Sequence, residues 1–148
     1  MCAMLASSVK SIQYNAFYDC FSLSTLCLSQ NLEEIGNSAF SSTNISSFVI
    51  PNSVTSVGDG ILQGCRSLTS LTIGDGVESI RLNPVSSCSS LKTIEVSAEN
   101  THFTAVDGVL FNRDKTLLIA CCGAKSGNIS FRPLLLPSET TRFVDVMS

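Results

Sequence analysis

Six apolar positions recur along residues 9–100 in a fixed order. The stretch 54–76, VTSVGDGILQGCRSLTSLTIGDG, aligns with 9–31, 32–53 and 77–100 so that apolar residues share columns. The six columns are Val9, Leu32, Val54, Val77; Ile12, Ile35, Val57, Ile80; Phe17, Phe40, Leu62, Val85; Leu23, Ile45, Leu68, Leu91; Leu26, Phe48, Leu71, Ile94; and Leu28, Ile50, Ile73, Val96. The first column advances in steps of 23, 22 and 23 residues, and the second copy regains the register although it lacks one residue near 41–43. Such a pattern identifies a repeat protein.

Each copy divides into two halves with different local patterns. One half alternates apolar and polar residues, as in 48–50 and 71–73, which predicts a short strand. The Gly, Asn, Asp and Pro residues that follow predict a turn. The V-x-x-I half predicts a second short extended segment on the opposite face, and the A-F-x-x-C or I-L-x-G-C segment predicts a helical or 3-10 turn. One copy alone cannot bury six apolar residues, so the copies are expected to stack as coils of a solenoid.

The pattern changes after residue 100. Two strand-like runs, 106–111 and 117–120, flank a polar turn at 112–116, which predicts a β-hairpin within an insertion at 101–133. The segment 134–137, LLLP, matches the end of the strand in the second copy and predicts a partial repeat over 134–148. The chain is therefore expected to form a single domain over 1–148. Because neither end carries a polar capping repeat, we expect the ends to be covered by further coils of a longer array or by self-association.

The repeat motif, V-x-x-I-x-x-x-x-F-x-x-C-x-x-L-x-x-L-x-I, resembles the BspA-like (Treponema-type) leucine-rich repeat. Its clearest copies are VTSVGDGILQGCRSLTSLTI and VKSIQYNAFYDCFSLSTLCL, and the resemblance includes the junction IPNSVTSVG at 50–58 and VDGVLFNRDKTLLIA at 106–120. It implies a right-handed solenoid with one short parallel strand per repeat of about 23 residues. It also implies a binding module, often of cell-surface proteins in bacteria and mucosal protozoa, with no enzyme activity and no catalytic residues.

The composition limits the classes of partner that the chain is expected to bind. Of 148 residues, 44% are hydrophobic and only 14% are charged, with a net charge of −3. No cluster of Lys and Arg exists that could neutralise nucleic-acid phosphates. No apolar run approaches the roughly 20 residues that span a bilayer, and residues 1–12 lack the charged region of a signal peptide. These features leave two locations open: the cytoplasm, or the cell surface if the chain is a segment of a longer secreted or membrane-anchored protein.

The cysteines predict packing rather than metal binding. Three of the seven, Cys20, Cys65 and Cys88, share one repeat column, where a thiol behaves as a small buried hydrophobe. A disulfide between Cys65 and Cys88 stays open as an alternative, because neighbouring coils stack about 5 Å apart. The chain has no C-x-x-C spacing, and its single histidine, His102, has no second ligand at zinc-finger spacing. No metal and no cofactor are expected.

The candidate binding site is the outward face of the predicted strands. Its two rows of outward positions are Thr25, Ser47, Ser70, Thr93 and Cys27, Val49, Thr72, Glu95. Small side chains in flat rows allow close approach of another protein. The rows contain no Tyr or Trp, which usually dominate interface energies, so a weak or multivalent interaction is expected.

No nucleophile motif such as G-x-S-x-G is present, so catalysis is not expected, and His102 is interpreted as a solvated residue. The family resemblance implies an adhesion-type function: binding of another protein, such as one of the host extracellular matrix or cell surface, or of a surface glycan. The alternative is an intracellular scaffold with the same fold. The sequons at Asn44 and Asn128 would matter only in a secretory pathway.

Overall fold

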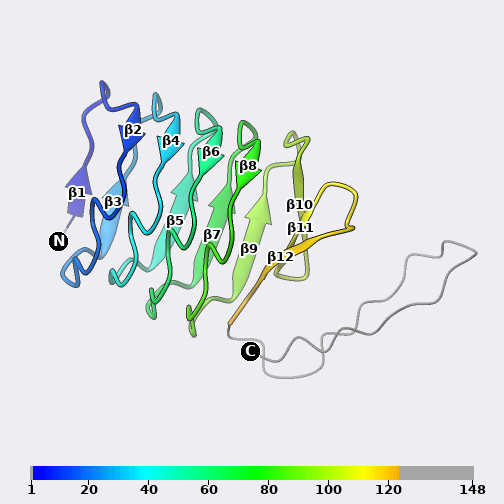
Figure 1. The fold of residues 1–148 in the computed structure, drawn as a ribbon. Coiled ribbons are helices and arrows are strands. Elements are labelled where there is room, and N and C mark those ends of the chain that lie inside the picture. Colours follow the sequence, from blue (N-terminus) through cyan, green and yellow to red (C-terminus); the bar gives the residue numbers. More distant parts are fainter. Residues whose placement is uncertain (1, 124–148) are drawn as a thin grey trace, which may run out of the picture.

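The computed structural model describes residues 2–123, and side chains from Met4 onward. Its elements are all strands (Figure 1). They are β1 Cys2–Met4, β2 Ser11–Ile12, β3 Thr25–Cys27, β4 Glu34–Ile35, β5 Ser47–Ile50, β6 Ser56–Val57, β7 Ser70–Ile73, β8 Ser79–Ile80, β9 Thr93–Val96, β10 Phe103–Val106, β11 Val109–Asn112 and β12 Leu118–Cys121. The predicted partial repeat at 134–148, the end of the predicted insertion and the Asn128 sequon lie outside the described residues.

The coils of the predicted solenoid lie side by side, with two parallel sheets on opposite sides (Figure 1). One sheet has the order β2-β4-β6-β8 and the other β5-β7-β9. Every pairing joins equivalent residues of successive copies; Ile12 pairs with Ile35, and Phe48 pairs with Leu71. The columns that contain Ile35, Phe48 and Ile50 therefore form rungs of the two sheets, and the predicted solenoid is confirmed.

A strand that the sequence pattern did not predict lies at the N-terminal end. β1 pairs in parallel with β3, with Cys2 beside Thr25 and Met4 beside Cys27. It has the position of a strand from a preceding coil. The signal is weak because the strand holds only three residues and has Ala3 where the copies hold Leu26, Phe48, Leu71 and Ile94.

The apolar columns form one continuous core. Leu32, Phe40 and Ile45 are fully buried, and so are their counterparts in the third copy. Phe40 lies between two other aromatic rings, stacked on Phe17 with centroids 5.2 Å apart and tilted against Phe48 at 4.9 Å. Burying one such side chain contributes about 1.5–3 kcal/mol. Since a coil buries these residues only against its neighbours, stability comes from stacking.

The predicted helical or 3-10 turns are wrong: within residues 2–123 these segments are hydrogen-bonded turns without a helix. Alternate N–H groups donate to the next coil, as from Ser38 to Asp59, Phe40 to Ile61 and Ser42 to Gln63, at 2.8–2.9 Å. The N–H of Ser41, which lies between them, donates within the turn to Ser38. A helix needs consecutive N–H groups to bond along the same segment. Left-handed residues four apart, Ser38 and Ser42, with φ of 53° and 58°, also interrupt any helical run.

The turns after the strands require close approach of successive coils. A Cβ atom added to Gly76 would lie 2.0 Å from the backbone oxygen of Asn52 in the preceding coil. No side chain fits at that distance, which explains the glycine in the predicted Gly74-Asp75-Gly76 turn.

The predicted hairpin is confirmed and is part of a three-stranded antiparallel sheet, β10-β11-β12. This sheet packs Phe103, Leu110, Ala120 and Cys122 into the solenoid core, next to β9. It therefore covers the core at the C-terminal end of the fourth copy.

Candidate functional site

The predicted outward rows lie on the strand face in register. Ser47, Ser70 and Thr93 form one row across β5, β7 and β9, and Val49, Thr72 and Glu95 form the next. The residues of β5 and β9 are exposed, and those of β7 are half-buried. The alternation of the strands has thus placed these six side chains as the sequence predicted.

The two remaining candidates belong to a different sheet. Thr25 and Cys27 lie exposed on β3, which pairs with β1 rather than with β5. Just before β3 and β5, backbone bonds connect the two coils from Asn44 N to Leu23 O at 3.1 Å and from Ser46 N to Ser24 O at 3.4 Å. The single-residue deletion in the second copy falls just before this junction, where β3 and β5 do not pair. The strand face is therefore divided between the first and second copies.

Apolar side chains mark the N-terminal half of the strand face. Met4, beside Cys27, is 81% exposed and Val49 is 60% exposed. Glu95, at the other end, is the only charged residue in the two rows. Exposed Met and Val side chains make few favourable contacts with water. A partner protein that covers this part of the face would therefore bury the most apolar surface.

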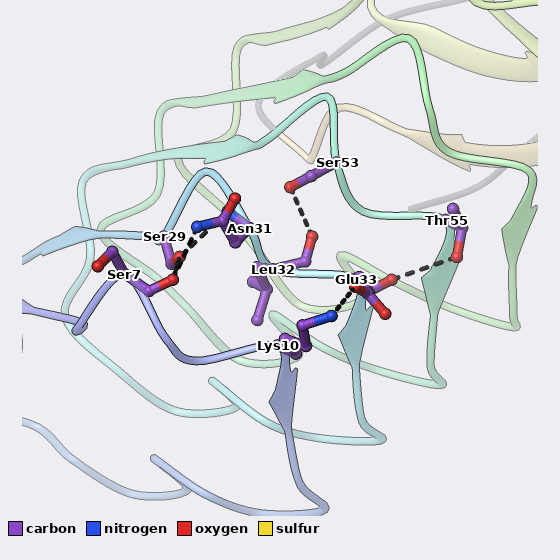
Figure 2. Close-up of polar contacts among 8 residues, drawn as sticks. All are labelled: Ser7, Lys10, Ser29, Asn31, Leu32, Glu33, Ser53 and Thr55. Carbon is purple, nitrogen blue, oxygen red and sulfur yellow. Dashed lines mark hydrogen bonds and ion pairs between the residues drawn. The ribbon is translucent and has the colours of Figure 1, made fainter.

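Polar side chains at the corner between the sheets bond to neighbouring coils (Figure 2). Asn31 Nδ2 donates to Ser7 O at 2.9 Å, and Ser53 Oγ donates to Leu32 O at 2.6 Å. Lys10 Nζ lies 2.9 Å from Glu33 Oε1, and this exposed pair contributes little to stability. The polar groups at this corner already bond to neighbouring coils. The corner is therefore a structural feature rather than a recognition site.

Two of the three cysteines that share a repeat column are buried. Cys65 and Cys88 are free thiols, and each Sγ donates to a carbonyl of the preceding coil, Phe40 O at 3.1 Å and Leu62 O at 3.0 Å. Burial raises the pKa of the Cys65 thiol and raises the pKa of Cys88 to about 12. The prediction of a buried thiol is wrong for Cys20, which is exposed because no coil in the described residues covers its turn.

The rate of thiol alkylation should distinguish the exposed cysteines from the buried ones. We expect iodoacetamide at pH 8 to modify Cys20 and Cys27 within minutes, because both are exposed and the thiolate is the reactive form. Cys65 and Cys88 should react at least about 100-fold more slowly, since burial limits both access and ionisation. Peptide mapping by mass spectrometry measures each rate, and equal rates in the folded protein would contradict the described packing.

A second surface, which the sequence analysis missed, lies on the turn between β2 and β3. Tyr14, Tyr18 and Phe21 are 69%, 49% and 68% exposed there. They are three of the eight large exposed hydrophobic residues in the described part of the chain. The signal was available: the positions of the second copy equivalent to Tyr14 and Tyr18 hold the polar residues Asn37 and Ser41.

The described residues do not assemble a metal cluster or a nucleophile–base pair around the histidine. His102 is exposed, with Nδ1 3.1 Å from Thr101 Oγ1. No group of three His, Cys, Asp or Glu residues within the described part could hold a metal ion. A search of the same residues also finds no helix of sufficient length and hydrophobicity for a membrane span.

Parallel coils, columns of apolar residues and an exposed strand face define a leucine-rich-repeat solenoid. The model of the BspA type leucine rich repeat region matches residues 3–116 in 6 copies. The chain belongs to this family. The structure continues the repeat on both sides of the four aligned copies, with β1 before them and with Asn100 one step of 23 residues after Val77.

Solved leucine-rich repeat proteins of bacteria share the fold. One from Bacteroides ovatus is 32% identical with a TM-score of 0.59, over 61% of this chain and 24% of its own. One from T. pallidum is 28% identical with a TM-score of 0.54, over 61% of this chain and 42% of its own. One from Eubacterium ventriosum, 23% identical, has a TM-score of 0.68 over 86% of this chain and 40% of its own. The chain thus spans less than half of each of these proteins. No curated protein matches it.

Proposed function

We propose that the chain is a non-catalytic protein-binding module that contacts its partner through the strand face. The observation that carries this proposal is the set of outward side chains on two groups of short parallel strands, β1-β3 and β5-β7-β9, most of them exposed. Strands about 4.8 Å apart hold these side chains at fixed spacing, and a rigid scaffold lowers the entropic cost of binding. Leucine-rich repeats generally mediate protein–protein interaction, which supports the same assignment.

The partner that we propose is a protein of the host extracellular matrix or cell surface, bound by a longer surface protein that contains this chain. The rows lack aromatic anchors, so one module binds weakly, and several modules or copies would raise the apparent affinity. A surface role would also suit the hydroxyl-rich, weakly charged composition.

Two matched substitutions test the strand face. Val49→Asp places a charge in the apolar half, and we expect saturable binding to extracellular matrix to weaken about 10-fold or more. Leu82→Asp is the control, because Leu82 is 75% exposed and lies outside both sheets. Surface plasmon resonance on immobilised matrix proteins measures both, with thermal unfolding to verify that each variant is folded.

Three results would overturn parts of the proposal. Equal loss of binding in Val49→Asp and Leu82→Asp would remove the strand face as the site. Saturable binding of the unmodified chain to proteins of a cell lysate, with none to matrix, would indicate the intracellular scaffold instead. Turnover of a substrate, measured with the purified chain, would exclude a purely binding role.

A further inference from the structure

Two sulfur-containing side chains lie next to each other on the strand face, where β1 lies beside β3 (Figure 1). Met4 and Cys27 are register partners in this parallel pair of strands. The side chains of register partners point to the same side of a sheet. Met4 is 81% exposed and Cys27 is an exposed free thiol, so both side chains point outward. A thioether and a thiol are therefore neighbours on an open surface.

Hydrogen bonds hold the two strands in this register. Leu5 N donates to Cys27 O at 3.2 Å, directly after the last residue of β1. Further along, Ser29 Oγ and Asn31 Nδ2 both donate to Ser7 O, at 3.2 Å and 2.9 Å. These bonds connect the chain that follows β1 to the chain that follows β3. The backbone thus fixes the distance between the two sulfur-bearing residues.

The spacing of the strands suits a metal ion held between two sulfur atoms. Neighbouring strands lie about 4.8 Å apart. A bond between a metal and a thiolate is about 2.3 Å long, so two such bonds in a line span about 4.6 Å. Because Met4 and Cys27 are both exposed, rotation of their side chains can bring Sδ and Sγ to this separation without moving the backbone.

The two donors favour one kind of metal. Thioether and thiolate sulfur are soft ligands, which select Cu(I), and Cu(I) accepts two sulfur ligands in a line. Neither β1 nor β3 contains a charged residue, so the pair lacks the carboxylate oxygens that calcium and magnesium require. A structural zinc site takes four ligands, and within the described part of the chain no group of three His, Cys, Asp or Glu residues could hold a metal ion.

We propose that Met4 and Cys27 bind Cu(I) on the strand face. On binding, the Sγ–H bond of Cys27 breaks, its proton passes to solvent, and a bond between copper and Sγ forms while the copper remains Cu(I). The charges of the thiolate and of Cu(I) cancel, so the occupied site adds no net charge to the apolar half of the face. The sequence analysis expected no metal because the repeat pattern did not predict β1, which supplies Met4. This inference does not rest on the proposed partner protein.

Protection from alkylation tests the site in the full chain. Cys2→Ser is introduced first, so that Cys27 is the only cysteine in the β1-β3 pair. The reduced protein receives one equivalent of Cu(I) under nitrogen and is then treated with iodoacetamide, and peptide mapping by mass spectrometry measures each rate. Cys27 should react at least about 10-fold more slowly than without copper. Cys20, an exposed thiol in the turn between β2 and β3, is the internal control and should change less than about 2-fold.

Two substitutions on the strand face test the thioether. Met4→Leu removes the sulfur but keeps a side chain of similar size, and we expect the affinity for Cu(I), measured by competition with bicinchoninate, to fall at least about 10-fold. Val49→Leu changes another exposed residue of the same face without removing sulfur and should leave the affinity unchanged. Circular dichroism verifies that both variants are folded.

The copper proposal fails if copper protects Cys20 and Cys27 equally, or if Met4→Leu binds Cu(I) as tightly as the parent. A loss of affinity in Val49→Leu that matches the loss in Met4→Leu would also overturn it. X-ray absorption at the copper edge gives a direct readout of the ligands. Two sulfur neighbours in the parent and one in Met4→Leu are expected, and a single sulfur neighbour in both would exclude Met4 as a ligand.

Discussion

Phe40→Ala is expected to lower the free energy of unfolding by about 3–5 kcal/mol, because it removes the largest fully buried side chain from the core. Its ring contacts Phe17 in the first copy and Phe48 in the strand half of its own copy. Deletion leaves a cavity that backbone bonds on both sides prevent from collapsing. The bond from Phe40 N to Ile61 O, 2.9 Å, fixes the turn to the next coil.

Phe21→Ala is the matched control for Phe40→Ala. Both residues are phenylalanines in turn segments, but Phe21 is 68% exposed. We expect its removal to change stability by at most about 0.5 kcal/mol. Urea unfolding followed by far-UV circular dichroism measures both variants. A loss below about 1 kcal/mol for Phe40→Ala would mean that stacked coils relax around a cavity, contrary to the packing described.

The sequence pattern predicts the solenoid because one physical requirement repeats. Each coil has to bury the same six positions against its neighbours, so the columns report stacking directly, and both sheets follow from them. The hydrogen bonding of the turns is harder to predict from the sequence. Whether Phe40 N bonds within its turn or to the next coil depends on the spacing of the coils, and this choice replaces the predicted helical turn with a β-turn.

The strand face could be predicted from alternation, since residues two apart on a strand share a side. The division between Thr25 and Ser47 could not, because whether two neighbouring strands pair depends on the path of the turns that precede them. The exposed aromatic residues of the turn between β2 and β3, Tyr14 and Tyr18, could have been predicted from the sequence. Comparing outward positions between copies, Tyr14 with Asn37, would have identified the copy that differs.

Asn100 is the polar residue on which attachment of the hairpin sheet depends. It takes the place in the first apolar column that follows Val77, yet it is only 1% exposed. Its Nδ2 donates to Gly74 O at 2.9 Å and to Val77 O at 3.1 Å. Its Oδ1 accepts from the N–H groups of His102 and Phe103, both at 2.8 Å. One side chain thus joins the fourth coil to the start of β10.

Asn100→Leu should destabilise the protein by at least about 3 kcal/mol, because up to four buried backbone groups lose their partners. That loss corresponds to a fall in Tm of roughly 10 °C for a domain of this size. Asn100→Asp nearly preserves volume but replaces the two donated bonds with an oxygen that faces two carbonyls. It should therefore destabilise by a similar amount, which would assign the effect to hydrogen bonding rather than to packing.

Asn31→Asp is the control, since Asn31 is exposed and its side chain donates one bond, to Ser7 O. Its effect should stay below about 1 kcal/mol. Hydrogen exchange followed by mass spectrometry locates the damage: in Asn100→Asp, amides of β10–β12 should lose protection before those of β5 and β7, because coils depend mainly on their neighbours. Unchanged protection of β10–β12 would show instead that burial of Phe103 and Leu110 suffices to hold the sheet on the solenoid.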